Sequence, residues 1–386
     1  MLLIVCISLA VIPFLTLHGY DSRQPKEFFS LFAVLVISLW GMYSGNVKKV
    51  DNNWLYLFIG WAYLSAWFIP HFSGLYNVQG MNLDGIWNYK PILYVVVYFL
   101  AMIVISSCSF TRSEIDMIIK VMMYSSFVMA GYCFFQYFGI EQFFRALPIR
   151  PESLPESSKV IGTMGNPTIV APFLIIGVWT AVYFKKYLSA AFIAVVVLMT
   201  RSDVALIAMA LSICYFISHG NLRRGLIIAF IVGISGAVLW HLHPLNDNGR
   251  FGLWSMVLSD MIHPVESVHK ISYFLTGWGF GAFPYMFSVL HGQESVWSNP
   301  HNEYLAVFYG TGFIGLALFM RLMWTFIRDG WKLTDHLSRC LMTCIVSLFL
   351  CACGTFVWHL GVYCLYSVVI IGVLYQLINK KGVSYG

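Results

Sequence analysis

The sequence predicts an all-α polytopic membrane protein that forms a single integral membrane domain over residues 1–386. Of these residues 59% are hydrophobic and only 10% are charged, whereas soluble domains usually carry about 25% charged residues. The mean hydropathy of +0.75 agrees with this class. Apolar runs of about 17 to 25 residues, long enough to cross a bilayer, recur from end to end. We place about twelve spans near residues 2–18, 27–44, 53–70, 91–107, 116–139, 168–184, 187–200, 203–218, 225–241, 302–325, 340–358 and 361–378.

Paired basic residues indicate how these spans are oriented. The pairs Lys48–Lys49, Lys185–Lys186, Arg223–Arg224 and Lys380–Lys381 all fall on one side of the membrane in this arrangement, and the positive-inside rule makes that side cytoplasmic. Both termini are therefore expected in the cytoplasm. The formal net charge of +6 is mostly a topology signal, because no basic stripe is interleaved with aromatics as nucleic-acid binding would require.

The first span is interpreted as a retained helix interrupted by Pro13, since it lacks a basic segment and a cleavage site. The turn after it, ending at Lys26, is expected to be solvated surface. All nine cysteines lie in or beside apolar runs, so no disulfide framework is predicted, and Cys351 and Cys353 are expected to pack within a helix.

Arg201 lies where a short apolar span ends and another begins at once, so the seventh and eighth spans form either one broken hairpin or two tilted helices. An arginine at membrane depth costs about 2.5 to 3.5 kcal/mol on insertion scales and tends to mark a ligand path. The alternative is an arginine that reaches the interface and pairs with Asp203.

The largest outer segment, residues 242–300, should contain an amphipathic helix on the membrane surface. Apolar residues recur there at helical spacing, and Arg250 at its start would stand at the mouth of the bilayer. The glycine-rich stretch 277–283 is expected to be a flexible turn, and it lacks the preceding strand of a dinucleotide site. The apolar residues of the predicted helix are Phe251, Trp254, Val257, Leu258 and Met261.

The stretch from Ser298 to Leu305 closes this segment and opens an apolar helix to about Thr325. Capping accounts for three of its polar or special residues: Asn299 as N-cap, Pro300 in the first turn and Glu303 near the positive end of the helix dipole. Capping does not account for His301, which is therefore a candidate catalytic residue. No metal site is predicted, because the pair His241 and His243 lacks a third ligand at defined spacing.

Arg201, Arg250 and His301 should all lie at the outer membrane boundary. Two guanidinium forks match the oxygens of a diphosphate, and a neutral histidine can accept a proton from an attacking hydroxyl. This set suits transfer of a glycan from a lipid diphosphate to an acceptor hydroxyl.

The pattern His301-Asn302, nine residues, then Gly312-x-x-Gly315 resembles the signature of the O-antigen ligases. Residues 248–250 followed by Trp254, and the glycine-rich turn 277–281, resemble the large periplasmic loop of the wider O-antigen ligase and polymerase superfamily. The resemblance implies a GT-C-like membrane glycosyltransferase of the bacterial inner membrane with the active site facing the periplasm. It also implies an undecaprenyl diphosphate-linked glycan as donor, lipid A core or another glycan as acceptor, and no metal or other cofactor.

By the same resemblance His301 is the base and Arg201 and Arg250 bind the diphosphate, with Trp254, Asn302, Glu303, Gly312 and Gly315 supporting them. Leu316 stands where the ligases often carry Gly, Thr or Tyr, so a polymerase of the same superfamily remains an alternative. Two other classes stay open. A lipid-linked glycan flippase or transporter should carry its charges near the midplane, and an assembly protein would need no catalytic His301.

Overall fold

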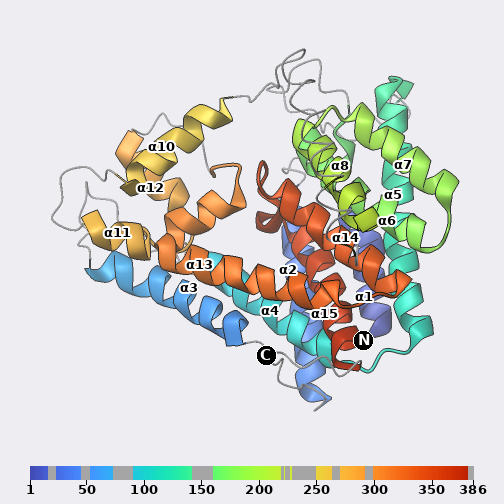
Figure 1. The fold of residues 1–386 in the computed structure, drawn as a ribbon, viewed down its shortest axis with the longest axis horizontal. Coiled ribbons are helices and arrows are strands. Elements are labelled where there is room, and N and C mark those ends of the chain that lie inside the picture. Colours follow the sequence, from blue (N-terminus) through green and yellow to red (C-terminus); the bar gives the residue numbers. More distant parts are fainter. Residues whose placement is uncertain are drawn as a thin grey trace.

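The computed structural model describes residues 1–15, 23–44, 53–72, 90–140, 160–218, 221, 227, 249–262, 270–291 and 299–380, and every regular element in these ranges is helical (Figure 1). The elements are α1 (Leu2–Val11), η1 (Ile12–Phe14), α2 (Arg23–Tyr43), α3 (Asn53–Phe72), α4 (Lys90–Ser107), α5 (Arg112–Tyr137), η5 (Gly162–Met164), α6 (Pro167–Tyr183), α7 (Tyr187–Met199), α8 (Asp203–Ser218), α10 (Arg250–Ile262), α11 (Lys270–Thr276), α12 (Phe283–His291), α13 (Glu303–Trp331), α14 (His336–Cys351), η6 (Val357–His359) and α15 (Gly361–Lys380).

Four of these segments are long and apolar enough to cross a membrane: Pro25–Tyr43, Arg112–Tyr137, Glu303–Trp331 and Gly361–Asn379. Six shorter apolar helices accompany them, among them α6, α7, α8 and α14. The prediction of an all-α membrane protein is therefore confirmed. The total of about twelve spans stays a prediction, and the ninth, 225–241, lies outside the described residues except for Ile227.

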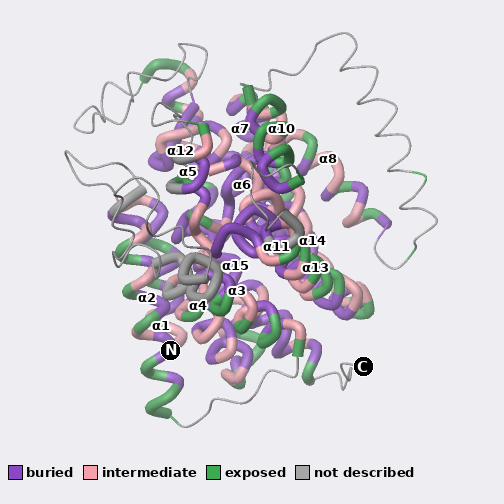
Figure 2. The backbone as a smooth tube through the Cα atoms, turned by 90° about the vertical axis from the view of Figure 1, so that its left-hand side faces the viewer, coloured by how far each residue is buried: buried purple, intermediate pink, exposed green. Residues whose placement is uncertain are grey.

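The main core forms around α6, α14 and α15. α15 packs against α2 and α4, and α14 packs against α6 and α8. α6 is apolar on all sides and almost wholly buried, as expected for a central helix (Figure 2). The central packing fixes the ends of α8, α14 and α15 relative to one another.

Several helix ends differ from the predicted spans; α13, for example, runs to Trp331 and not to about Thr325. α1 gives way to a 3₁₀ turn at Pro13, as the ring of proline favours, and the predicted span 340–358 is wrong over its last residues, 352–358. α14 ends at Cys351, so Cys353 lies beyond the helix rather than within it. Residues 352–360, called here the α14–α15 connection, form turns whose backbone bonds to other parts of the chain. Tertiary contacts thus prevent the helix that the mostly apolar sequence of residues 352–358 predicts.

Lys26 is buried, with 3% of its surface exposed, and does not lie in a solvated turn as predicted. Its Nζ donates hydrogen bonds to the carbonyl oxygens of Leu15 at 2.8 Å and Thr163 at 2.7 Å. The lysine therefore ties the start of α2 to the chain after η1 and to η5, and its charge is stabilised by carbonyl dipoles.

The outer segment contains three helices, α10, α11 and α12, where the sequence predicted one. They pack on the first half of α13 (Figure 1). The predicted helix exists as α10, but its buried stripe includes Leu253 as well as Val257 and Met261, whereas Phe251 and Leu258 are exposed. His291 of α12 holds α10 in place, because its Nε2 lies 3.0 Å from Oδ2 of Asp260.

α13 is kinked at Gly312, which has φ 66° and ψ −169°. The glycine-rich turn 277–281 docks beside this kink. The N–H groups of Trp278 and Gly279 donate to the carbonyl oxygens of Tyr309 and Gly310, both at 2.9 Å. The turn predicted to be flexible is thus hydrogen-bonded to α13.

Gly277→Ala should strongly destabilise the protein. A Cβ at Gly277 would lie 2.5 Å from backbone atoms of Gly310, Thr311 and Gly312, which cannot rotate away, and the residue has φ +75°. We expect a loss of about 3 kcal/mol or more in the free energy of unfolding in detergent. Gly139→Ala is the matched control, because its φ of +71° is similar and nothing lies within 4 Å. Equal losses in both variants would contradict the docking of the turn on α13.

Candidate functional site

His301 lies in the turn that precedes α13. The N-cap of this helix is Asn302, whose Oδ1 accepts hydrogen bonds from the N–H groups of Tyr304 and Leu305, so the predicted capping role of Asn299 is wrong. Asn299 instead accepts a hydrogen bond from the N–H of His301 at 2.9 Å. This bond holds His301 at φ 50°, in the left-handed region that residues other than glycine rarely adopt.

The His301 ring packs edge-on against Phe356 of the α14–α15 connection. The ring centroids are 5.0 Å apart and the ring planes are inclined at 67°. The histidine is half-buried. Its position is therefore set by two segments, its own backbone turn and the connection.

Arg250, the first residue of α10, reaches the same connection. Its Nη1 donates a hydrogen bond to the carbonyl oxygen of Gly354 at 2.8 Å. The guanidinium is also within electrostatic range of Asp203, the first residue of α8. Arg250 thus lies between the start of α8 and the α14–α15 connection. The residue that it contacts there, Gly354, is two positions before Phe356.

Trp254 follows Arg250 by one helical turn, so both side chains lie on one face of α10. Its Nε1 donates to the carbonyl oxygen of Pro300 at 2.8 Å. Because Pro300 directly precedes His301, α10 is bonded both to the histidine turn and to the α14–α15 connection. Trp254 thus contacts the residue before His301, and its supporting role stays a prediction.

Arg201 directly follows the last turn of α7 and is exposed. Its φ is 52°, the left-handed conformation that commonly ends a helix, although glycine is the usual residue there. Within the described ranges, no ion pair joins Arg201 to Asp203, so the pairing alternative is not supported. Val204, the residue after Asp203, packs against Gly354, and this contact brings the start of α8 to the α14–α15 connection.

Glu303 is buried, with 3% of its surface exposed, and it clamps the α14–α15 connection onto α13. Its backbone N–H donates to the carbonyl oxygen of Ala352 at 2.9 Å. Its Oε1 accepts from the N–H groups of Trp358 and His359, and its Oε2 lies 2.8 Å from Nδ1 of His359. Glu303 therefore holds the α14–α15 connection against α13, in addition to placing a negative charge at the start of that helix.

Gly312 and Gly315 lie away from His301, farther along α13. At Gly315 a Cβ would meet the side chains of Thr311 and Trp61, and Trp61 also donates to the carbonyl oxygen of Thr311 at 2.9 Å. These glycines permit the kink and the close packing of α3 and α11. The sequence pattern from His301 to Gly315 thus joins a site residue to two packing positions.

The sequence analysis missed the α14–α15 connection, including Gly354, Phe356 and His359. It assigned residues 352–358 to a span because they are mostly apolar. The signal that could have shown a break is the run Gly354-Thr355 followed by His359, a turn former and a polar residue between two helices.

The site therefore contains Arg250, Trp254, His301 and Glu303 around one connection, with Arg201 beside the end of α8 that reaches it. The guanidinium of Arg250 and the imidazole of His301 can bind an anionic group and move a proton there. That Arg201 takes part in this site stays a prediction. No protein-family model matches the sequence, and no characterised protein is found to match it either.

Proposed function

We propose that the protein is a bacterial membrane glycosyltransferase that moves a glycan from an undecaprenyl diphosphate carrier to an acceptor hydroxyl. The function we favour is that of an O-antigen ligase, with lipid A core as acceptor. The observation that supports it is that the α14–α15 connection touches both Arg250 of α10 and His301 of the turn before α13, two distant parts of the chain. An anion-binding group and a proton acceptor next to each other are what this reaction needs.

In the proposed reaction His301 takes the proton from the acceptor hydroxyl. The acceptor oxygen then forms a bond to C1 of the donor glycan, and the bond between C1 and the phosphate oxygen breaks. The electron pair of that bond leaves with undecaprenyl diphosphate. Arg201 and Arg250 bind the diphosphate and stabilise the charge that develops on it.

The wider arrangement belongs to the same proposal. The protein would have about twelve spans in a GT-C-like fold in the inner membrane, with both termini cytoplasmic and the site facing the periplasm.

Deleting the gene and analysing the surface glycan tests this function and separates its two forms. Loss of attachment, with long chains still on the carrier lipid, is expected for a ligase. Glycans shortened to single repeats would instead identify a polymerase of the same superfamily. An unchanged surface glycan and unchanged carrier lipid would contradict both.

Transfer by the purified protein should persist in a metal chelator, since the proposed reaction uses arginine and histidine side chains alone.

Arg250→Lys should lower kcat/KM for transfer by about 10- to 100-fold. Lysine keeps the positive charge but has a single amine. The planar guanidinium of arginine can span two phosphate oxygens while it also donates to the Gly354 carbonyl, and lysine loses this ability. The measurement is transfer by purified protein at several donor concentrations. Lys120→Arg is a control on α5, whose side chain lies over Phe184. Wild-type kcat/KM in Arg250→Lys would remove Arg250 from the diphosphate site.

A further inference from the structure

His359 is a second histidine, in the connection that borders the candidate site, and the sequence did not single it out. It ends η6, in the α14–α15 connection that contacts Arg250 through Gly354 and His301 through Phe356. Its side chain is 52% exposed, although its Nδ1 is bonded to buried Glu303 at 2.8 Å. His359 is thus anchored on one side and accessible on the other.

The carboxylate of Glu303 fixes the orientation and the charge of His359. Because Nδ1 donates to Glu303, Nε2 is the nitrogen left to contact a substrate. Burial lowers the pKa of His359, but the carboxylates of Glu303 on α13 and Glu27 on α2 outweigh it, so the pKa lies above its ordinary value. The two carboxylates therefore favour the imidazolium form more than in an ordinary histidine.

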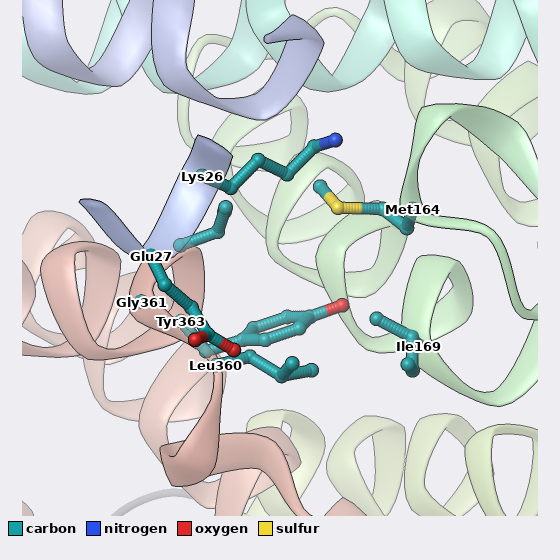
Figure 3. A pocket seen from close by; sticks show the side chains of 8 residues that line it. Lys26, Glu27, Met164, Ile169, Leu360, Gly361 and Tyr363 are labelled. Atoms are coloured by element: carbon teal, nitrogen blue, oxygen red, sulfur yellow. The ribbon is translucent and has the colours of Figure 1, made fainter. Parts of the chain in front are cut away.

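The surroundings of His359 contain few other ionisable groups. Glu27 and Lys26 of α2 line a pocket with Leu360 and Gly361, the residues that follow His359, and with Met164 and Ile169 opposite (Figure 3). Lys26 points its amine toward the carbonyls of Leu15 and Thr163, which bind it. The Cys364 thiol of α15 lies against the Trp358 carbonyl. The charged side chains that shift the pKa of His359 are thus the carboxylates of Glu303 and Glu27.

The geometry points to His359, held by Glu303, as a third cationic ligand of the diphosphate beside Arg201 and Arg250. This inference rests on the proposed function, because it assigns a further residue to the same substrate group. Nε2–H would donate a charge-assisted hydrogen bond to a phosphate oxygen. The contact would be made while the imidazole is protonated and lost as the pH rises through its pKa.

Binding of farnesyl diphosphate, a short prenyl diphosphate without a glycan, tests this inference. Affinity is measured on purified protein in detergent from pH 6 to pH 9, with folding checked by circular dichroism and gel filtration. We expect His359→Gln to bind about tenfold more weakly than wild type at pH 6 and nearly as well at pH 9. The ionisation of the probe is common to all variants and cancels in this ratio.

Two further variants separate a bound cation from a structural clamp. Glu303→Gln should move the fall in affinity to lower pH, because the carboxylate that raises the pKa of His359 is gone. His359→Lys should bind well across the whole range, since lysine stays charged. His336→Gln, a matched control at the opposite end of α14, should behave as wild type.

The outcomes distinguish this inference from the proposed function. If wild-type protein binds no farnesyl diphosphate, or if binding is unaffected by Arg201→Ala with Arg250→Ala, the proposed function fails as well. If binding needs the arginines but the ratio of wild type to His359→Gln is one at every pH, only the role of His359 is overturned.

Discussion

His301→Asn should reduce glycan transfer by about 10²- to 10⁴-fold while the purified protein stays folded. The size of the effect is that of removing a general base. Asparagine is a better replacement than alanine for this test, because His301 has φ 50° and asparagine tolerates the left-handed region. His301→Ala should be equally inactive but also less stable. Transfer is measured with purified protein and donor lipid, and folding by thermal unfolding in detergent.

A second variant separates the base from the packing of its ring. Phe356→Leu removes the edge-on ring contact at 5.0 Å but leaves the imidazole in place. We expect a loss of about tenfold or less, since a small displacement of a catalytic group is less harmful than its removal. Full activity of His301→Asn would remove the base assignment, whatever the result for Phe356→Leu.

The sequence was most informative where periodicity and charge act locally. The apolar helix after His301, the helix beginning at Arg250 and the break at Pro13 were all predicted, because helix periodicity, capping residues and proline act within a few residues. The exact N-cap was displaced from Asn299 to Asn302, since two amides compete for the same turn.

The rest depended on contacts between distant segments. Nothing local shows that Glu303 clamps the α14–α15 connection, or that Lys26 is bound by carbonyls of Leu15 and Thr163. Apolar residues in 352–358 favoured a helix, but the backbone there bonds to α10 and α13 instead. The candidate residues were therefore proposed from their chemistry, while the connection that contacts Arg250, His301 and Glu303 required the fold.

Arg201→Gly should make the protein more stable and much less active. At φ 52° an arginine side chain costs roughly 1 to 2 kcal/mol relative to an unstrained residue. Glycine removes this strain but loses about 0.5 to 1 kcal/mol to its greater freedom when unfolded. The net gain expected is therefore between about 0 and 1.5 kcal/mol, seen as a higher unfolding temperature. Transfer should fall by about 100-fold or more, because one guanidinium of the diphosphate site is gone.

Lys185→Gly is the matched control for Arg201→Gly. Lys185 has φ 58° and precedes α7 at the end opposite Arg201. It should gain similar stability and keep full activity, since it is remote from the α14–α15 connection. Equal activity in the two variants would contradict the role of Arg201, and a loss of stability in Arg201→Gly alone would show that its side chain holds the fold. Because Lys185 is strained in the same way as Arg201, the strain alone assigns no role to either side chain, and the difference in activity between the two glycine variants is what tests the proposed binding by Arg201.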